Sequence, residues 1–593
     1  MSVSCRRQDG ERTTDNRAAA WYVANYAPLT VNTLVDLIRS SVIGRNDVVD
    51  GPFGSRRVTY ADYTASGRSL TFIEDYIRHQ VLPLYANTHT ESSATGLQTT
   101  RFREDARSII RRCVRATDEH AVVFCGSGST GAIDLMVRVL GIRIPEGLDD
   151  RYGFTEQIPP TERPVVFIGP FEHHSNELPW RESIADLVVI PEDSDGHIDL
   201  GELDAALDRF AERPLKIGSF SAASNVTGIT TDTAAVASLL HRNGALSFWD
   251  VAAAAPYVGI SMEPVDPDDP LSYKDAIFIS PHKMIGGPGT PGLLVARKDL
   301  FTNRVPAVPG GGTVAFVNPD EHRYLDDIEH REEGGTPSII GAIRAGLAFA
   351  LKEAVGIDTI REREKSFIDR AIDSWSKNSN IEILGNPESD RLSIVSFVIR
   401  HGERRLHYNF VVALLNDLFG IQSRGGCSCA GPYGHRLLGI DIETSREYER
   451  EISRGCEGIK PGWVRVNFNY FISNQVFEFI LDAVKLVADH GWRMVPQYRF
   501  DPMTALWTHA DGLGSAPLSL YDVTFTGDGM QHPELRKTEG EDVLAGYLAE
   551  GEQILLTVQP GENDPGRPDL TEDFERLRWF HLPDEMHQEL LGS

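Results

Sequence analysis

The chain has 593 residues and carries 58 Lys and Arg against 86 Asp and Glu, a formal net charge of −28. This charge repels polyanions and leaves no basic stripe, so we expect no nucleic-acid partner. No stretch has the pattern of a signal peptide or the length of a membrane span, and the six cysteines are too sparse for a disulfide framework. We therefore expect a cytoplasmic protein with reduced thiols and no membrane contact.

Short apolar runs alternate with helical patterns from about residue 120 to residue 300. Strands separated by helices predict an α/β domain with right-handed crossovers and a largely parallel, buried sheet. We place this large domain at residues 51–335, after an N-terminal segment of residues 1–50. The length and the 41% hydrophobic content allow further cores beyond it.

Two further parts are expected after the large domain. Residues 336–492 mix helical and strand patterns and predict a smaller α+β domain. Residues 493–593 form a C-terminal extension with two candidate strands, in YDVTFTG (521–527) and GEQILLTVQ (551–559). This extension contains no motif that indicates its role.

The first candidate site is a Gly/Ser/Thr loop at residues 126–131, between a predicted strand and a predicted helix. Backbone N–H groups at a helix start, with hydroxyls beside them, can bind a phosphate. The glycine spacing also satisfies the dinucleotide-binding pattern, but that pattern needs an acidic residue at a strand end about 20 residues on. The residues there, Asp149 and Asp150, lie in a predicted polar loop, which weakens the dinucleotide hypothesis. A plain tight turn is the remaining alternative.

Two charged residues follow later predicted strands. Asp250 ends the run ALSFWD and could hold a cationic nitrogen or cap a following helix. Lys283 lies between a strand at 276–279 and a glycine-rich turn; alone, it would be a solvated loop lysine. An anchored phosphate, a carboxylate facing a ring nitrogen and an amine able to form an imine together describe a pyridoxal-phosphate site.

Six segments, in chain order, resemble motifs of the class V aminotransferase family, in its cysteine desulfurase and selenocysteine lyase branch. They are VTYADYTASG, CGSGSTGAID, FEHHSNELPWRE, SNVTG, DVAAAAP and SPHK. The resemblance runs from about residue 60 to residue 490. It implies a fold-type-I, pyridoxal-phosphate-dependent enzyme with a mostly parallel seven-stranded sheet, acting on an L-amino acid.

The resemblance assigns roles residue by residue. It implies that Lys283 forms the internal aldimine and that His173 stacks on the cofactor ring; a metal at His173 and His174 would lack a third ligand, so we expect no metal. The implied cofactor contacts are Ser129, Thr130, Ser280 and His282 around the phosphate, Asp250 at the pyridinium nitrogen, and Asn225 near the phenolic oxygen or the substrate carboxylate.

One segment implies a homodimer. EEGGTPSIIGA resembles the segment in which a threonine completes the phosphate site of the neighbouring subunit, and that threonine is Thr336 here.

The small domain carries the residues implied for the substrate. IQSRGGCSCAGPYGH resembles the segment with the sulfur-accepting cysteine, which places Cys429 at that position and Arg424 at its arginine. A thiol beside arginine suits attack on sulfur, although a cysteine in a tight loop can also be inert. Arg465, in GWVRVNFNYF, is implied to bind the substrate α-carboxylate. The pair Cys427 and Cys429 also resembles molybdenum-cofactor sulfurases, which widens the range of possible sulfur-acceptor proteins.

Three departures from the family pattern leave the reaction open. Ala253 replaces a glutamine beside the cofactor, Gly131 replaces a glutamate after the phosphate-binding threonine, and Cys427 and Ser428 replace a His pair. The leading hypothesis is a cysteine desulfurase-like cleavage of a C–S bond with Cys429 as acceptor. The alternatives are an aminotransferase, lyase or epimerase that does not use this cysteine, and a nucleotide-binding or non-catalytic protein.

Overall fold

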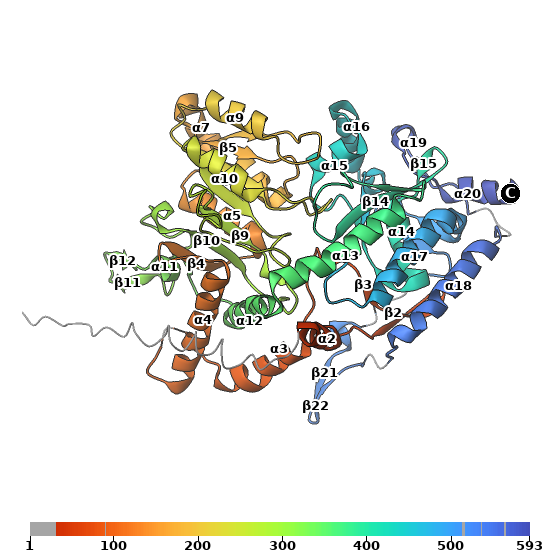
Figure 1. Cartoon of the computed structure of the whole chain (residues 1–593), viewed down its shortest axis with the longest axis horizontal. Coiled ribbons are helices and arrows are strands. Elements are labelled where there is room, and N and C mark those ends of the chain that lie inside the picture. Colours follow the sequence, from red (N-terminus) through yellow and green to blue (C-terminus); the bar gives the residue numbers. More distant parts are fainter. Residues whose placement is uncertain are drawn as a thin grey trace, which may run out of the picture.

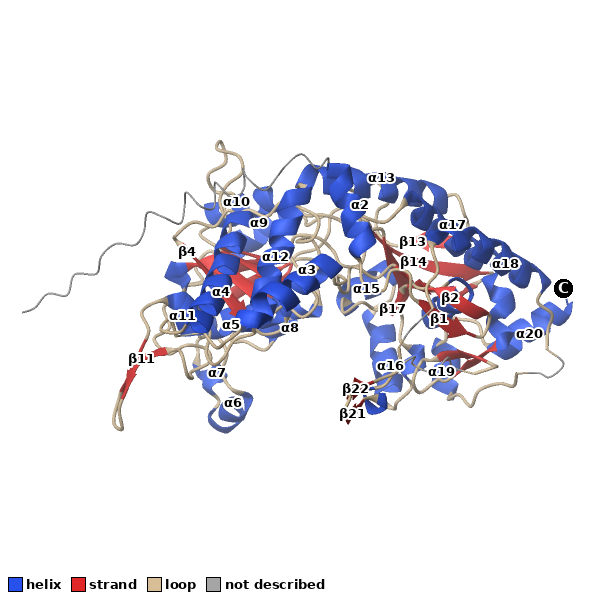
Figure 2. Cartoon of the chain, turned by 90° about the horizontal axis from the view of Figure 1, so that it is seen from below, coloured by secondary structure: helices blue, strands red, loops and turns tan. Residues whose placement is uncertain are grey.

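Two lobes, each built on its own sheet, make up the part of the chain that we describe (Figures 1 and 2). The structure is a computed structural model that describes residues 31–88, 90–512, 516, 518–534, 537–561 and 565–592. Cys5 and most of the predicted N-terminal segment lie outside these residues. The other five cysteines are free thiols.

The large lobe contains the predicted seven-stranded sheet. Its strand order is β4-β10-β9-β8-β7-β5-β6, and β10 alone runs antiparallel to its neighbours. The strands are β4 (His120–Cys125), β5 (Val165–Ile168), β6 (Asp186–Val189), β7 (Lys216–Ser221), β8 (Leu246–Asp250), β9 (Ala276–Ile279) and β10 (Gly292–Arg297). Adjacent residues such as Phe248 and Trp249 are both fully buried, because helices cover both faces of the sheet. The α/β prediction is confirmed.

The helices of the large lobe follow the predicted alternation. They are α3 (Thr71–Tyr76), α4 (Ala94–Cys113), α5 (Gly128–Val139), α6 (Glu146–Tyr152), α7 (Phe154–Gln157), α8 (Leu178–Arg181), α9 (Leu200–Arg209), α10 (Thr233–Arg242), α11 (Ile328–Glu332) and α12 (Ile339–Val355). A two-stranded hairpin, β11 (Val314–Val317) with β12 (His322–Tyr324), projects from this lobe (Figure 2). Asp149 and Asp150 lie in helix α6, so our prediction of a loop there was wrong; neither follows a strand, as a dinucleotide site would require.

The small lobe is an antiparallel sheet covered by helices. Its strands are β13 (Ile381–Ile383), β14 (Ile394–His401), β18 (Trp463–Asn467) and β17 (Arg424–Gly426), with β15 (Arg404–Arg405) paired to β14. Its helices are α13 (Ile357–Trp375), α14 (Tyr408–Phe419), α15 (Gly431–Leu438), α16 (Ile442–Ser453) and α17 (Asn474–His490). Helix α12 still packs on α4 of the large lobe, so closely that a Cβ on Gly346 would lie 2.7 Å from Ala106. The exact domain boundary near residue 335 stays a prediction.

The described N-terminal residues join the small lobe. After α2 (Val31–Ser41) and the hairpin of β1 (Val48–Gly51) and β2 (Gly54–Arg57), strand β3 (Thr59–Tyr60) pairs in parallel with β16 (Ile421–Gln422). After β3 the chain passes from the small lobe into the large lobe, where α3 and α4 precede β4.

The C-terminal extension packs along the small lobe (Figure 1). It contains β19 (Tyr498–Phe500), β20 (Trp507–His509), β21 (Thr524–Thr526), β22 (Gly529–Gln531), α18 (Leu544–Thr557), α19 (Glu572–Leu577) and α20 (Pro583–Gly592). The strand predicted in 521–527 is confirmed by β21, but the strand predicted at 551–559 was wrong, since most of that segment belongs to α18. Leu544, Tyr547, Gly551 and Leu555 are its buried positions, which is the spacing of one helical face. Every helix in the described ranges is too short or too polar to cross a bilayer.

Candidate active site

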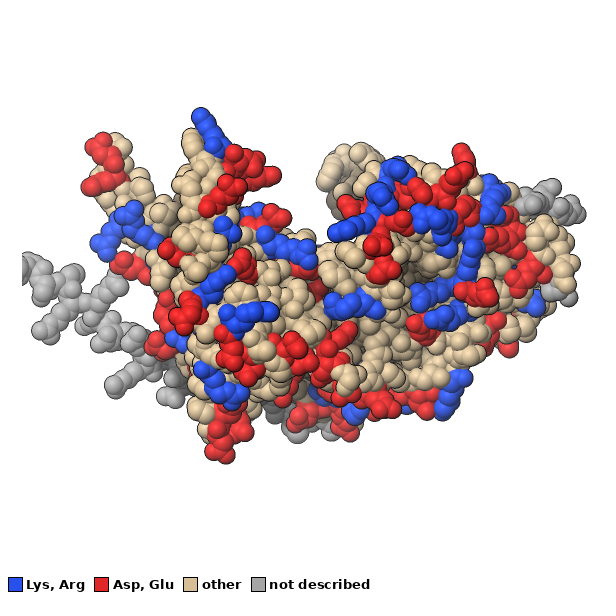
Figure 3. All heavy atoms as spheres, turned by 90° about the horizontal axis from the view of Figure 1, so that it is seen from above, with Lys and Arg blue, Asp and Glu red and all other residues tan. Residues whose placement is uncertain are grey.

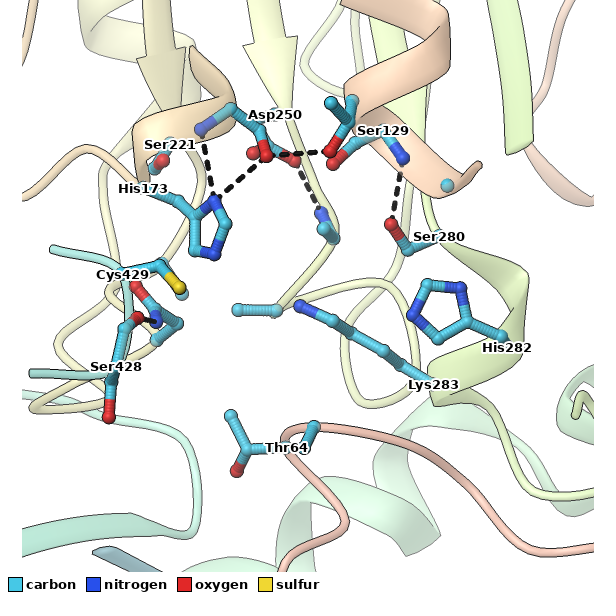
Figure 4. A pocket seen from close by; sticks show the side chains of 18 of the residues that line it. Thr64, Ser129, His173, Ser221, Asp250, Ser280, His282, Lys283, Ser428 and Cys429 are labelled. Atoms are coloured by element: carbon cyan, nitrogen blue, oxygen red, sulfur yellow. Dashed lines mark hydrogen bonds between the residues drawn. The ribbon is translucent and has the colours of Figure 1, made fainter. Parts of the chain in front are cut away.

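A cavity of about 210 Å³ lies where β7, β8 and β9 end, at the junction of the two lobes (Figure 4). Both lobes and the segment after β3 contribute to its wall. All of the predicted site residues except Thr336 line this cavity: Ser129, Thr130, His173, Asn225, Asp250, Ser280, His282, Lys283, Arg424, Cys429 and Arg465. Open α/β sheets bind ligands at this edge, which is where the sequence placed the site.

The N-terminus of α5 forms a cradle for an anion. Ser280 Oγ accepts a hydrogen bond from the Ser129 backbone N–H at 2.8 Å, and Ser127 makes no side-chain cap, so the first turn of the helix is open to a ligand. Gly128 has φ +56°, and a Cβ there would lie 2.6 Å from Ser280 Oγ. Only glycine fits this position, and the cradle fits the phosphate of pyridoxal phosphate.

Asp250 and Lys283 face the space beside this cradle (Figure 4). Burial raises the pKa of Asp250, against the opposing effects of the Ala252 N–H at 2.9 Å and of Lys283. Burial lowers the pKa of Lys283 to about 8, although Asp250 opposes this shift. No helix follows Asp250, because residues 252–257 form turns, so its carboxylate is not a helix cap. An amine with this pKa can react with an aldehyde near neutral pH.

His173 lies in the wall of the cavity, and side-chain hydroxyl groups link it to the first turn of α5. Its Nδ1 lies 3.0 Å from Ser175 Oγ, which lies 2.6 Å from Thr130 Oγ1. Burial first, and then the Lys283 charge, lower the pKa of His173 to about 3. The imidazole is therefore neutral, as a ring that stacks on a cofactor should be. His174 is turned away and accepts a hydrogen bond at Nε2 from the Gly431 N–H at 3.0 Å.

Cys429 lies in a loop that the large lobe holds in place. The Cys429 carbonyl accepts from the His174 N–H, and the Ser428 carbonyl accepts from Asn225 Nδ2, both at 2.8 Å. Ser428 and Cys429 both have left-handed backbone angles, φ +51° and +56°. Such consecutive angles are unfavourable outside glycine and persist where the surroundings impose them. The half-buried thiol lines the cavity.

Arg465 is held by a residue that our sequence analysis missed. Its Nη2 donates to Asp62 Oδ1 at 2.9 Å and its Nη1 donates to the Asn225 carbonyl at 2.9 Å. Arg424 Nη1 approaches the other Asp62 oxygen at 3.8 Å. Asp62 is the one acidic residue of VTYADYTASG, and that was the available signal. A carboxylate therefore already occupies one side of the arginine expected to bind the substrate carboxylate.

Glu172 is a second residue that the sequence analysis missed. It is 4% exposed, and its oxygens accept hydrogen bonds from the Gly169 N–H, from the N–H and hydroxyl of Ser221, and from Asn176 Nδ2. Burial raises its pKa to about 7. These bonds fix the loop that carries His173 to the end of β7, so Glu172 positions His173.

The departures from the family pattern have local structural consequences. Ala253 lines the cavity with a methyl group where the family has an amide. Gly131 packs on Gly126, and a Cβ at Gly131 would lie 3.0 Å from the Gly126 Cα. Thr336 is exposed and lies outside the cavity of its own chain, where its hydroxyl is 3.5 Å from Asn87 Nδ2.

Comparison with known proteins identifies the family. The sequence profile of class V aminotransferases matches residues 59–446, about two thirds of the chain. The chain belongs to the class V aminotransferase family. Members of this family are pyridoxal-phosphate enzymes, and the cradle, Asp250 and Lys283 fit that cofactor.

Curated relatives and solved structures agree with this assignment. A protein named probable cysteine desulfurase from Halalkalibacterium halodurans is 28% identical over 393 residues, which cover 65% of this chain and 87% of the relative. One with the same name from Staphylococcus epidermidis is 27% identical over 401 residues, covering 66% and 88%. The apo cysteine desulfurase of Thermococcus onnurineus has a TM-score of 0.58 at 22% identity over 73% of this chain and 95% of that chain. The fold-type-I architecture is confirmed.

Proposed function

We propose that this enzyme removes the sulfur of L-cysteine, releasing L-alanine and leaving the sulfur as a persulfide on Cys429. The proposal rests on one observation: the Cys429 thiol, the Lys283 amine and the Arg465 guanidinium line a single cavity of about 210 Å³. A nucleophilic thiol, a base and a carboxylate-binding group are the three side chains that this reaction needs.

Different residues of the cavity would bind the cofactor and the substrate. The first turn of α5, with Ser129, Thr130, Ser280 and His282, would hold the phosphate of the cofactor, and Asp250 would keep its ring nitrogen protonated. The bound cofactor supplies a protonated ring that accepts the electron pair released at the substrate Cα. Arg465 would hold the substrate α-carboxylate through paired hydrogen bonds, with Arg424 and Asn225 beside it.

Lys283 and Cys429 would act on the substrate itself. Lys283 Nζ removes the Cα proton, and Cys429 Sγ attacks the substrate sulfur. The C–S bond breaks with its electron pair remaining on Cβ, which takes up a proton, while a new S–S bond forms at Cys429. L-cysteine and one thiol thus give L-alanine and one persulfide, so the step requires no further oxidant or reductant.

Release of L-alanine from L-cysteine tests this function. We expect the holoenzyme to form L-alanine, and the Cys429→Ser variant to lose at least 99% of this activity while keeping the visible absorbance of the bound cofactor. Cys427→Ser is the matched control, since Cys427 lies two residues away and outside the cavity lining. Equal losses in both variants, or loss in neither, would contradict the role of Cys429.

A second candidate is an aminotransferase or another lyase or epimerase that does not use the cysteine. The methyl group of Ala253, in place of the family amide, favours it by leaving room for a larger substrate. The activity of such an enzyme would not change in the Cys429→Ser variant. An aminotransferase would also require a 2-oxo acid as amino acceptor.

A homodimer, a sulfur-acceptor protein and a cytoplasmic location complete the proposal. Thr336 is exposed and does not line its own cavity, which suits a residue that completes the phosphate site of a partner subunit. A half-buried persulfide needs an acceptor that reaches the cavity, and free thiols suit a reducing compartment. Light scattering should give twice the chain mass of 65.7 kDa; a monomer would leave Thr336 without this role.

A further inference from the structure

A second, smaller pocket lies beside β3 and is separate from the active-site cavity. It has a volume of about 50 Å³, and its charged lining residues are Arg39, Arg45, Arg57, Arg68 and Glu541. We call it the arginine pocket. Four guanidinium groups against one carboxylate make an unusual concentration of positive charge in a chain whose net charge is −28. Elsewhere, acidic and basic side chains are interspersed over both lobes of the face shown in Figure 3.

Arg57 is buried in this pocket without adequate partners. It is 4% exposed, and its Nε has no hydrogen-bond partner among the described residues. Its remaining contacts are long, at 3.4 Å to Thr59 Oγ1, 3.5 Å to Asn46 Oδ1 and 3.8 Å to Glu541 Oε1. A buried guanidinium with one N–H group unpaired and the others only weakly paired destabilises a fold, so this arrangement indicates a ligand that supplies further acceptors.

The other arginines add charge that the protein leaves largely uncompensated. Arg39 pairs with Asp36 and also donates to the Phe471 carbonyl. Arg68 donates to the Ile43 carbonyl at 2.8 Å, but neither Arg45 nor Arg68 forms an ion pair with an acidic residue in the described ranges. Burial, and then the charge of Arg45, lower the pKa of Arg57, with Glu541 opposing. The pocket therefore favours an anion.

The size of the pocket and its walls limit the kind of anion. A volume of about 50 Å³ suits a single tetrahedral oxyanion and is too small to enclose a whole nucleotide. Arginine's planar fork binds phosphate oxygens through paired hydrogen bonds. Helix α2, strands β2 and β3, the loop at residues 471–473 and the C-terminal extension all contribute lining residues, so one ligand would connect these five parts of the chain.

We propose that the arginine pocket binds a phosphate group, either as inorganic phosphate or as the end of a phosphorylated small molecule. The bound oxygens would accept hydrogen bonds from Arg57 and neutralise Arg45 and Arg68. The ligand would then join α2 and the extension to β3, which leads directly to Asp62. This proposal is independent of the reaction proposed above.

Calorimetric titration of the holoenzyme with inorganic phosphate tests the proposal, with the cofactor saturating so that its own phosphate site is filled. We expect binding that weakens about tenfold or more in Arg45→Ala and in Arg68→Ala, since each variant loses one positive charge from the pocket wall. Glu541→Gln should bind phosphate more tightly, because the substitution removes the one negative charge in the wall. Arg446→Ala is the matched control; Arg446 is exposed on α16 and outside the pocket, so binding should be unchanged.

Several outcomes would overturn the proposal. These are no binding at millimolar phosphate, equal affinity in the Arg45→Ala and Arg446→Ala variants, and no gain in Glu541→Gln. If an arginine variant does not fold, the tighter phosphate binding expected in Glu541→Gln still tests the proposal. Titration with glycerol 3-phosphate separates the sources: tighter binding than inorganic phosphate indicates a phosphorylated molecule, and weaker binding indicates inorganic phosphate itself.

Discussion

Burial lowers the pKa of Lys283, which predicts that the reactivity of its amine depends measurably on pH. The folded-state pKa is lowered to about 8, so the reactive neutral amine becomes more abundant as the pH rises through 8. At pH 7 roughly a tenth of the amines would be neutral, against about one in a few thousand for an ordinary lysine. We expect the rate at which cofactor-free protein binds pyridoxal phosphate covalently to rise with pH to a midpoint near 8, as followed by stopped-flow absorbance.

Asp250→Asn provides the control for this prediction. The Asp250 charge raises the pKa of Lys283, so its removal should shift the midpoint to lower pH. A midpoint near 10 in the wild-type protein would mean that the amine is solvated and that burial does not activate it.

We expect Asp62 to affect substrate binding, because it holds Arg465 in position. Asp62→Ala removes the acceptor at 2.9 Å from Arg465 Nη2, and we expect KM for L-cysteine to rise between about tenfold and a hundredfold, corresponding to ~1.5–3 kcal/mol for a charge-assisted hydrogen bond. Asp62→Asn keeps an oxygen acceptor and should raise KM much less. Steady-state kinetics that show equal KM in the two variants would contradict a positioning role.

The meeting of most candidate residues at one cavity was predictable, because each follows a buried strand or lies in a quoted motif. Lys283 comes after β9 and Asp250 ends β8, so the sheet brings them together. Asp62 and Glu172 were missed because their importance lies in partners distant in sequence, which are Arg465 and Ser221. A single sequence contains no signal for such pairs.

At the scale of elements, the Cys429 loop depends on hydrogen bonds from the large lobe. His174→Ala removes the acceptor for the Gly431 N–H and so loosens a loop with two left-handed residues. We expect persulfide formation in a single turnover to slow about tenfold, with unchanged cofactor absorbance.

His435→Ala is the matched control for the loop, since His435 lies in the adjacent helix α15 and does not line the cavity. A persulfide rate that is unchanged in His174→Ala, or that falls equally in His435→Ala, would show that these hydrogen bonds do not position the thiol.

The strand predicted at 551–559 was wrong because tertiary packing favours a helix there. The run ILLTV within residues 551–559 is typical of a strand by composition, yet it lies mostly in α18. Packing against α14 favours the helix here. Gly551 lies against Phe419 so closely that a Cβ would be 2.4 Å from the Phe419 ring. Tertiary contact with α14 overrides local β propensity, and the sequence alone does not show that contact.

At the scale of the whole molecule, the extension is part of the fold of the small lobe. Its buried residues include Leu544, Leu555, Phe574, Phe580 and Leu582. Each fully buried apolar side chain contributes roughly 1.5–3 kcal/mol, so together they approach the total stability of a domain. We expect a chain truncated after residue 492 to aggregate or to unfold at least 10 °C lower, a shift of the size that several kcal/mol gives.

Replacement of the exposed hairpin β21–β22 by a short Gly/Ser linker is the control for truncation, and its Tm should not change, because the residues of both strands are exposed. A truncated chain with the wild-type Tm would contradict a structural role for the extension. The alternating pattern of the large lobe was sufficient to predict its sheet, whereas the packing of the extension depends on long-range contacts that leave no local pattern.

The most direct test of Cys429 as sulfur acceptor is a single turnover with L-cysteine, followed by mass spectrometry of the peptide that contains Cys429 and by measurement of L-alanine. We predict that this peptide gains one sulfur atom for each L-alanine released, and that Cys429→Ser gives neither product. L-alanine released with no sulfur on Cys429, or sulfur found on Cys427 instead, would contradict this role of Cys429.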